Sequence, residues 1–397
     1  MRVLLLTPSL PFPPYRGDKL KIFNLVSILS RRHDIVILTF TASRKDEQYI
    51  SEVRRFCSDV LTVRLPMWQS ILQCALNVLS ARPFQVAYYS SGRMRRLLSQ
   101  TLRNGHFDVV HTHFIRMAQY SADLQGVPRL LDLTDAVSLY LERFLAAERN
   151  VLKRCLLKSE YTRMKRYERI ITRYDRTMVC SLVDRKVLLN SAPGTRVELL
   201  ENGVDLEYFA PNPGVQPESG TIICTGNMSY FPNANGVRYF VEEILPLVKL
   251  RVPGAKFLVV GQNPPATVRS LASDDVVVTG AVPDLRPYYL RSVVAVSPIR
   301  FGSGTLNKVL EPMAMGIPIV ATPVGTEGLP IKDGEHLLIA ESPSDFADRV
   351  VELLNDPAMR RRLAANALEL VRTHFGWPGI ADKLEAAYLD VVQQRVE

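Results

Sequence analysis

Short apolar runs alternate with longer amphipathic stretches along the first half of the chain. Runs rich in Val, Ile and Leu predict buried strands, which fall at residues 3–6, 34–40, 60–65, 109–111, 129–133 and 177–180. Residues 18–31 carry apolar side chains at helical spacing between the first two of these runs. Strands separated by helices predict a parallel sheet with right-handed crossovers.

The second half repeats this alternation after a linker. Residues 210–220 are rich in Pro and Gly, and the apolar runs that follow predict strands at residues 221–225, 256–260, 276–279, 293–296 and 317–321. The pattern predicts an α/β chain of two doubly wound, Rossmann-like domains with a cleft between them. We expect bounds of 1–205 and 206–375, and a helix over 376–397 that crosses back to the N-terminal domain.

The amino-acid composition and net charge limit which kinds of molecule the protein is expected to bind. The chain has 397 residues, of which 47% are hydrophobic and 22% charged, as in ordinary folded proteins. Lys and Arg number 49 against 40 Asp and Glu, which gives a net charge of +9. This charge suits phosphorylated small molecules, anionic lipid headgroups or nucleic acid. No motif of basic and interleaved aromatic residues supports binding to RNA or DNA, so no nucleic-acid partner is expected.

Cysteine usage and the terminus predict a cytoplasmic protein. The five Cys are scattered and never spaced as metal ligands, which favours reduced thiols. The apolar run at residues 3–6 is too short for a signal peptide, and we find no apolar run of about 18 residues.

A loop and helix over residues 300–314 carry the clearest candidate chemistry. We expect the helix to start close to Val309, because Pro312 is tolerated only near a helix start. The amino end of a helix favours an anion. Lys308 would meet phosphate there, and Glu311 could accept hydrogen bonds from two vicinal ribose hydroxyls. The alternative is a surface Lys–Glu pair on an ordinary helix.

Several motifs, in this order along the chain, resemble the GT-B glycosyltransferases of the family-4, or group 1, type. They are the Pro-rich loop with Gly17, DVVHTH at 108–113, NGVD at 202–205 followed by Tyr208 and Phe209, Lys308 with EPMA at 311–314, Gly316, Pro318, and FGW at 375–377. Residues 13–19, 160–168 and 226–230 are similar to a branch associated with bacterial exopolysaccharide assembly.

The resemblance implies transfer of a sugar from a UDP- or GDP-linked donor with retention of anomeric configuration. The C-terminal domain would bind the nucleotide sugar, and the N-terminal domain a glycan or lipid-linked acceptor of surface polysaccharide or glycolipid synthesis. No cofactor and no metal are expected. The absence of a DxD-like motif agrees, since Asp274 and Asp275 are interpreted as a turn.

The resemblance also assigns site residues. Lys308 and Arg300 would stabilise the leaving diphosphate, and His113 would reach the donor sugar. The predicted donor-binding residues are Gly17, Asn227, Ser303, Gly304, Thr305, Leu306, Asn307 and Glu311, and the predicted acceptor-binding residues are Arg16, Asp18 and Asp135. The alternatives are a solvated strand-end charge for Arg300, a structural role for His113 and a helix N-cap for Asp135.

Two differences from the family pattern leave the identity of the donor sugar undetermined. Ser303 stands eight residues before Glu311, where the family commonly has a Glu. Residues 226–229 also lack an Arg and Lys that the family often carries, and either Arg300 or Arg16 with Lys19 would replace that charge. A nucleotide-sugar epimerase or hydrolase, and a degenerate subunit that only binds, are the rival functions on this fold.

An apolar stripe at helical spacing occupies residues 67–79, with Arg82 and residues 93–96 nearby. Packing into the core is the favoured interpretation of such a stripe. The alternative is a helix that lies on an anionic membrane, on the inner face of the cytoplasmic membrane, and presents a lipid-linked acceptor.

Overall fold

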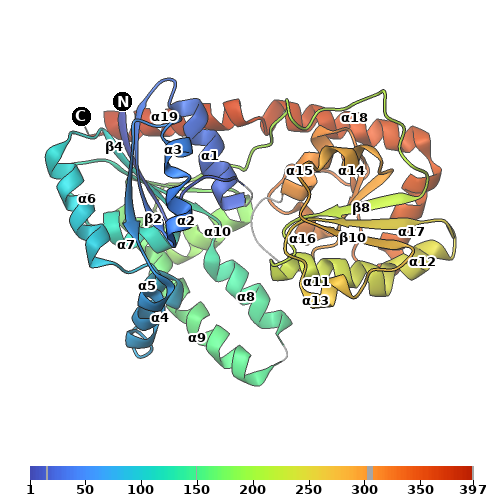
Figure 1. Ribbon diagram of the computed structural model, residues 1–397, viewed down its shortest axis with the longest axis horizontal. Coiled ribbons are helices and arrows are strands. Elements are labelled where there is room, and N and C mark those ends of the chain that lie inside the picture. The colour runs from blue at the N-terminus through green and yellow to red at the C-terminus, as the bar shows by residue number, and fades with distance from the viewer. Residues whose placement is uncertain (15–16, 149, 302–306, 396–397) are drawn as a thin grey trace. The chain divides into compact units, whose positions relative to one another are not determined.

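The computed structural model describes residues 1–14, 17–148, 150–301 and 307–395, and only the backbone of residues 17 and 18. The chain forms two compact units (Figure 1). Unit 1 comprises Met1–Glu201 and Trp377–Glu397, and unit 2 comprises Asn202–Gly376. The sequence had placed these boundaries after residues 205 and 375.

Unit 1 is built on a parallel sheet of seven strands in the order β3-β2-β1-β4-β5-β6-β7. The strands are β1 (Arg2–Thr7), β2 (Asp34–Thr41), β3 (Asp59–Arg64), β4 (Val109–His113), β5 (Arg129–Thr134), β6 (Arg176–Val179) and β7 (Val197–Leu199). Successive residues of β1 point to opposite faces. Val3 and Leu5 join a core with α1 and α19, whereas Leu4 and Leu6 join the core beneath α6.

The helices of unit 1 cover both faces of this sheet (Figure 1). They are α1 (Gly17–Leu29), α2 (Arg44–Glu47), α3 (Ile50–Val53), α4 (Met67–Leu76), α5 (Phe84–Tyr88), α6 (Gly92–Asn104), η1 (Ile115–Met117), α7 (Ala118–Ser121), α8 (Val137–Ala147), α9 (Val151–Tyr167), η2 (Glu168–Arg173), α10 (Leu182–Ser191) and α19 (Trp377–Gln393). Trp377 is only 4% exposed and anchors α19 in the core with α1.

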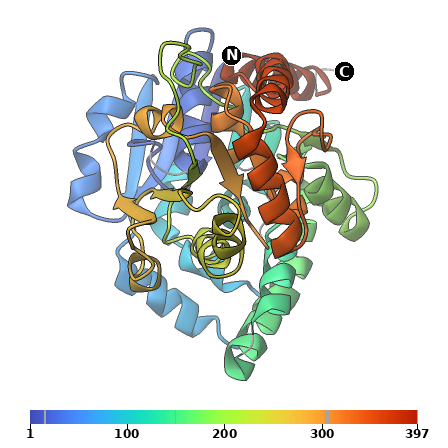
Figure 2. The same cartoon turned by 90° about the vertical axis from the view of Figure 1, so that its right-hand side faces the viewer.

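Unit 2 has a second parallel sheet, of six strands in the order β10-β9-β8-β11-β12-β13, with helices on both faces (Figure 2). Its strands are β8 (Thr221–Thr225), β9 (Lys256–Val260), β10 (Val276–Gly280), β11 (Val294–Ser297), β12 (Ile319–Ala321) and β13 (Leu338–Ile339). Its helices are α11 (Phe231–Tyr239), η3 (Phe240–Ile244), α12 (Leu245–Lys249), α13 (Ala266–Arg269), α14 (Arg286–Leu290), α15 (Asn307–Ala314), α16 (Pro323–Thr326), α17 (Pro343–Asn355) and α18 (Pro357–His374).

Side chains on the two faces of this sheet pack into two separate hydrophobic cores. Ile222 of β8 packs with α11 and α17, and the next residue, Ile223, packs with α15 and α18. The predicted architecture of two parallel α/β sheets is therefore confirmed. The strand order reverses beside β8 in unit 2 and beside β1 in unit 1, and such points mark where ligands bind in open parallel sheets.

The helix α15 begins at Asn307, two residues before the expected start. Pro312 consequently lies inside the helix, and it cannot donate the usual hydrogen bond to the carbonyl of Lys308. The helix ends soon afterwards at Ala314.

The favoured interpretation of the apolar stripe at residues 67–79 was wrong. Most of its large apolar side chains are exposed, namely Met67, Trp68, Ile71, Leu72, Leu76 and Leu79. The apolar residues recur at helical spacing because α4 is amphipathic. The side of α4 that faces the protein, however, is the small polar one, which includes Ser70. None of the helices in the described ranges is both long and apolar enough to cross a membrane.

Candidate functional site

The start of α15 places Lys308 against α11 of unit 2. The Lys308 ammonium donates to the side-chain carbonyl of Asn233, a buried residue in the first turn of α11. The amide nitrogen of Asn233 in turn donates to the backbone carbonyl of Asn227, at 2.9 Å. Asn233 therefore ties Lys308 to the loop that follows β8.

Glu311 lies one turn further along α15 and is held by a chain of hydroxyl groups. The buried Tyr289 hydroxyl donates to Glu311 Oε2 at 2.9 Å. The same hydroxyl is 2.6 Å from Oγ1 of Thr225, the last residue of β8. Glu311 and Lys308 thus both lie near the carboxyl end of β8, and their spacing of three residues had predicted that they emerge on one side of the helix.

The electrostatics of this pair are unusual. Burial lowers the pKa of Lys308 to about 8 and raises the pKa of Glu311 to about 7, although each charge partly favours the other. Burial therefore makes both charges costly to maintain. A ligand that carries negative charge and hydroxyl groups would satisfy both side chains.

Two glycines allow the loops after β8 and β9 to pack closely. Gly226 has φ +146°, and a Cβ there would lie 2.7 Å from the amide nitrogen of Asn233. A Cβ on Gly261, with φ +155°, would lie 1.8 Å from the carbonyl oxygen of Gly226. These positions require glycine. Asn227 follows directly, and its side-chain oxygen accepts from the backbone N–H and the hydroxyl of Ser229.

Arg300 is exposed and contacts other residues of α11 than Lys308 does. Its guanidinium donates to the side-chain oxygen of Asn235 at 3.0 and 3.2 Å and lies 4.6 Å from the ring centroid of Tyr239. Asn235 and the Lys308 partner Asn233 are two residues apart on α11, and side chains at that spacing do not share a face. The structure thus does not bring Arg300 beside Lys308.

In unit 1, His113 belongs to a buried charged cluster. His113 Nδ1 is 3.2 Å from Oδ2 of Asp132, and the Lys21 ammonium is 3.1 Å from Oδ1 of the same carboxylate. Lys21, only 1% exposed, also donates to the carbonyl of Leu200 at 3.0 Å. Burial alone would raise the pKa of Asp132, but the Lys21 ammonium and the hydrogen bond from His113 hold it below its usual range.

This arrangement fixes the chemistry of the second ring nitrogen. Because Nδ1 faces a carboxylate, a neutral His113 carries its proton on Nδ1 and presents Nε2 as an acceptor. Within the described part of the chain, Nε2 of His113 is buried and has no hydrogen-bond partner. A buried polar atom without a partner is available to a ligand.

The backbone beside this cluster is strained. Phe114, which follows His113, has φ +70°, and Thr134, at the end of β5, has φ +66°. Residues other than glycine rarely adopt these values, and such strain concentrates at functional sites. The Thr134 backbone N–H donates to Asp132 Oδ1 at 3.0 Å, so the strained turn also contributes to holding the carboxylate.

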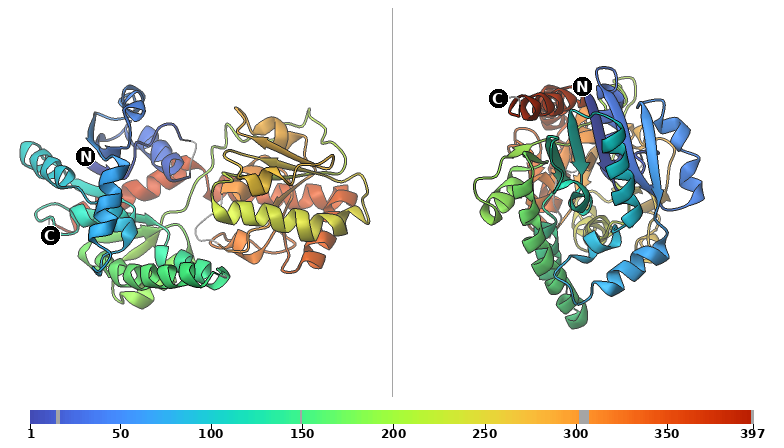
Figure 3. Two further views of the ribbon diagram at one scale, coloured as in Figure 1. Left: turned by 60° about the horizontal axis from the view of Figure 1, so that its bottom comes forward. Right: turned by 90° about the vertical axis from the view of Figure 1, so that its left-hand side faces the viewer.

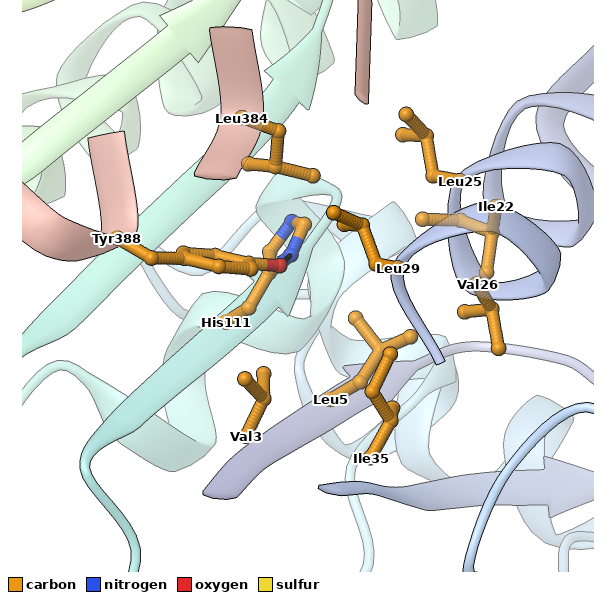
Figure 4. A pocket seen from close by; sticks show the side chains of 10 residues that line it. All are labelled: Val3, Leu5, Ile22, Leu25, Val26, Leu29, Ile35, His111, Leu384 and Tyr388. Carbon is orange, nitrogen blue, oxygen red and sulfur yellow. Dashed lines mark hydrogen bonds between the residues drawn. The ribbon is translucent and has the colours of Figure 1, made fainter. Parts of the chain in front are cut away.

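His111 lies on the same face of β4 as His113 and interacts electrostatically with Asp132, but its hydrogen bond goes to another residue. Its Nδ1 is 2.6 Å from the Tyr388 hydroxyl on α19, and burial lowers its pKa to about 3. Figure 4 shows both side chains at the wall of a small pocket lined mostly by aliphatic residues of β1, β2, α1 and α19. The pocket accommodates no more than about one water molecule, so it is a gap in the core rather than a sugar site.

The remaining predicted residues divide into two groups. Arg16, Ser303, Gly304, Thr305 and Leu306 lie outside the described residues. Of the others, Gly17 begins α1, followed by Asp18, and Asn307 begins α15. Asp135 lies directly before Ala136, the N-cap residue of α8.

The sequence analysis predicted no site role for the residues that contact Lys308, Glu311 and His113, directly or through one other residue. They are Asn233, Tyr289 and Thr225 in unit 2, and Lys21 and Asp132 in unit 1. One signal was present for Lys21, which lies beside Ile22 and one turn before Leu25 on the apolar side of α1. A lysine in such a position needs a buried partner. The partners of Lys308 and Glu311 carried no comparable signal.

No group of three or more His, Cys, Asp or Glu side chains that could hold a metal ion occurs in the part of the chain that the structure describes. Two separate candidate clusters can be described, each within its own unit. One is Lys308, Glu311 and their partners in unit 2, and the other is His113, Asp132 and Lys21 in unit 1.

Comparisons with known proteins relate the chain to glycosyltransferases. The family profile described as "Glycosyl transferases group 1" matches residues 219–356. The D-inositol 3-phosphate glycosyltransferase of Stackebrandtia nassauensis is 25% identical over 342 residues, which cover 79% of this chain and 74% of that protein. An uncharacterized 44.6 kDa protein in the cps region of Klebsiella pneumoniae is 20% identical over 393 residues, covering 94% and 96%.

A solved structure shows the same fold. HepE of Anabaena in complex with UDP-glucose aligns with a TM-score of 0.69 and 13% identity, over 98% of this chain and 100% of that one. At this level of identity the likeness concerns the fold.

Proposed function

The chain belongs to the GT-B glycosyltransferases of the group 1, family-4 type, and on that premise we propose that it is a retaining enzyme that uses a nucleoside diphosphate sugar. The acceptor is a glycan or a lipid-linked sugar of bacterial surface polysaccharide or glycolipid synthesis, handled by a cytoplasmic protein at the membrane surface. The relative from a cps region and the UDP-glucose complex of a structural neighbour support this choice.

The single observation that carries the proposal is the half-buried Lys308–Glu311 pair at the start of α15. In the proposed complex Lys308 neutralises the diphosphate, together with the helix dipole. The Glu311 carboxylate, kept in place by Tyr289, accepts hydrogen bonds from two ribose hydroxyls. Such a ligand would add opposite charge and further hydrogen bonds to those that Asn233 and Tyr289 already provide.

In unit 1, the proposed role of His113 is to accept a hydrogen bond at Nε2 from a hydroxyl of the transferred sugar. Asp132 keeps the imidazole in the tautomer with the proton on Nδ1. Lys21 keeps Asp132 ionised. Arg300, in contact with Asn235 and Tyr239, has a weaker claim to a catalytic role.

A panel of nucleotides and nucleotide sugars tests the proposal. A ligand that binds only the folded chain raises its melting temperature by mass action. We expect one nucleoside diphosphate, UDP or GDP, and its sugars to raise the Tm, and the matching sugar to appear on an acceptor with its anomeric configuration retained. Free sugar or an epimer without an acceptor product would instead identify a hydrolase or epimerase.

Glu311→Ala should weaken binding of the nucleoside diphosphate by about 1.5–3 kcal/mol, because a charged acceptor for two hydroxyls is lost. The fold should persist, since Tyr289 keeps Thr225 as its partner. Titration calorimetry measures the affinity, and Glu352→Ala, on the exposed surface of α17, is the control. Unchanged affinity in the Glu311 variant would remove this residue from the donor site.

Turnover should survive EDTA. In the proposed site Lys308 and the start of α15 provide the positive charge that the leaving diphosphate needs, so no divalent ion is required. The measurement is turnover with a matched acceptor, with and without chelator. Loss of activity in EDTA followed by rescue with Mg²⁺ or Mn²⁺ would contradict the metal-free mechanism.

A further inference from the structure

The helix α4 carries an unusually exposed apolar surface. Trp68 is 67% exposed and Leu79, just beyond the helix, is fully exposed. Met67, Ile71, Leu72 and Leu76 complete the same face at helical spacing, and all are exposed. No charged residue occurs between Arg64 and Arg82. Large apolar side chains gathered in this way mark an interaction surface.

The start of α9 presents a second set of exposed apolar side chains, Val151, Leu152 and Leu156. They are interleaved with the exposed basic residues Lys153, Arg154 and Lys158. Figures 1 and 3 show α4 and the α8–α9 pair extending on the same side of the sheet of unit 1.

Specific contacts fix α9 to the segment after α4. The Arg163 guanidinium donates to the backbone carbonyl of Val78 at 2.5 Å and lies over the Phe84 ring at 4.7 Å. The Glu160 carboxylate accepts from the backbone N–H groups of Phe84 and Gln85 at 2.9 and 3.1 Å. These contacts join α9, which carries the second apolar set, to the segment that follows the first set.

The charge along α9 is mostly positive, whereas the neighbouring α8 carries the exposed Glu142. Between residues 151 and 173, the acidic residues are Glu160 and Glu168, and both are buried. The basic residues in this span are Lys153, Arg154, Lys158, Arg163, Lys165, Arg166, Arg169 and Arg173. Arg64, Arg93, Arg95 and Arg96 add exposed positive charge near the ends of the α4–α5 segment.

We propose that α4 and the first turns of α9 dock on an anionic bilayer. The apolar side chains enter the boundary between headgroups and acyl chains, Trp68 lies at the interface, and the basic side chains contact lipid phosphates. A second copy of the chain fits less well, because it would bring the same positive charges together. This proposal rests on the proposed function in one respect, namely that docking on the membrane would give the enzyme access to a lipid-linked acceptor.

Vesicle binding of the full chain tests this surface without any turnover. The chain has two tryptophans, and Trp377 is buried, so a change in emission on binding reports on Trp68. We expect the protein to float with phosphatidylcholine vesicles that contain phosphatidylglycerol. We also expect its tryptophan emission to shift to the blue when it binds them. Pure phosphatidylcholine vesicles should bind far less protein, and added salt should weaken binding to the anionic ones.

Substitutions on α4 test whether this helix contacts the vesicle surface. Ile71→Glu with Leu76→Glu should weaken vesicle binding about tenfold or more, because two apolar contacts are lost and two negative charges face the lipid. Both side chains are exposed in the folded chain, so folding should be unaffected. Leu250→Glu, which changes an 80% exposed side chain on unit 2, should bind as wild type.

Three outcomes would overturn the proposal. They are no binding to anionic vesicles, equal binding to neutral ones, and a dimer in solution that the double variant dissociates. The Tm shift with nucleoside diphosphates, measured on the same samples, separates the two proposals. An intact Tm shift without vesicle binding rejects only the membrane surface, and vesicle binding without a Tm shift rejects only the donor site.

Discussion

Lys308→Met is expected to lower kcat about a hundredfold or more, as loss of one preorganised electrostatic contact to a leaving group typically does. Negative charge on the diphosphate grows while the glycosidic bond breaks, so the ammonium stabilises the transition state more than the bound donor. Steady-state kinetics at saturating donor measure the effect. Lys332→Met removes a surface lysine whose ion pair contributes little and serves as the control.

A different kinetic outcome would change the role of Lys308. If KM rises while kcat stays at the wild-type value, the lysine binds the ground state and the transition state equally. The catalytic assignment would then be wrong, and the start of α15 would be only a binding element.

The same variant should alter how stability depends on pH. The pKa of Lys308 is about 8 in the folded chain and near 10.5 when unfolded, because burial disfavours the charge. Between these values the unfolded chain binds more protons, so wild-type stability gains about 1–2 kcal/mol as pH rises through this range. Lys308→Met should lack that gain. Urea unfolding of both proteins at pH 7.5 and pH 10, roughly bracketing the window, isolates the difference.

Most of the fold could be predicted because apolar, β-branched runs identify buried parallel strands directly. Thr221–Thr225 and Lys256–Val260 were predicted with the bounds that the structure has. The edge strands β7 and β13 were missed, since two or three residues carry no periodic signal. For residues 67–79 the helix was predicted, but the same spacing fits a helix packed in the core and one exposed to a membrane.

The candidate site was predictable only where its residues are neighbours in the sequence. Lys308 and Glu311 share one turn of one helix, so their spacing placed them together. Asn233, the partner of Lys308, lies 75 residues before it. Lys21 and Asp132 are 111 residues apart and meet because the strand order β1-β4-β5 brings β5 close to the helix that follows β1. The order of strands in a sheet is a property of the whole chain, and no local pattern encodes it.

Lys21→Met is expected to destabilise the chain by about 3–5 kcal/mol, because it leaves the Asp132 carboxylate buried with too little compensating charge. Without the lysine, burial should raise the pKa of Asp132 above that of an unfolded chain. The variant should then regain stability as pH falls from 7 toward 5, where Asp132 can take up a proton. Lys45→Met, at an exposed position on α2, should show neither effect.

The double variant Lys21→Met with Asp132→Asn separates a structural role from a functional one. Removing both charges together should restore about 2 kcal/mol or more of the lost stability, since neither buried charge is left alone. Activity should stay low, because the amide that replaces the Asp132 carboxylate no longer fixes the proton on Nδ1 of His113, and Nε2 loses its defined role as acceptor. If the stabilised double variant instead turns over donor at the wild-type rate, the cluster of Lys21, Asp132 and His113 serves the fold alone, and the sugar contact must be sought elsewhere in unit 1.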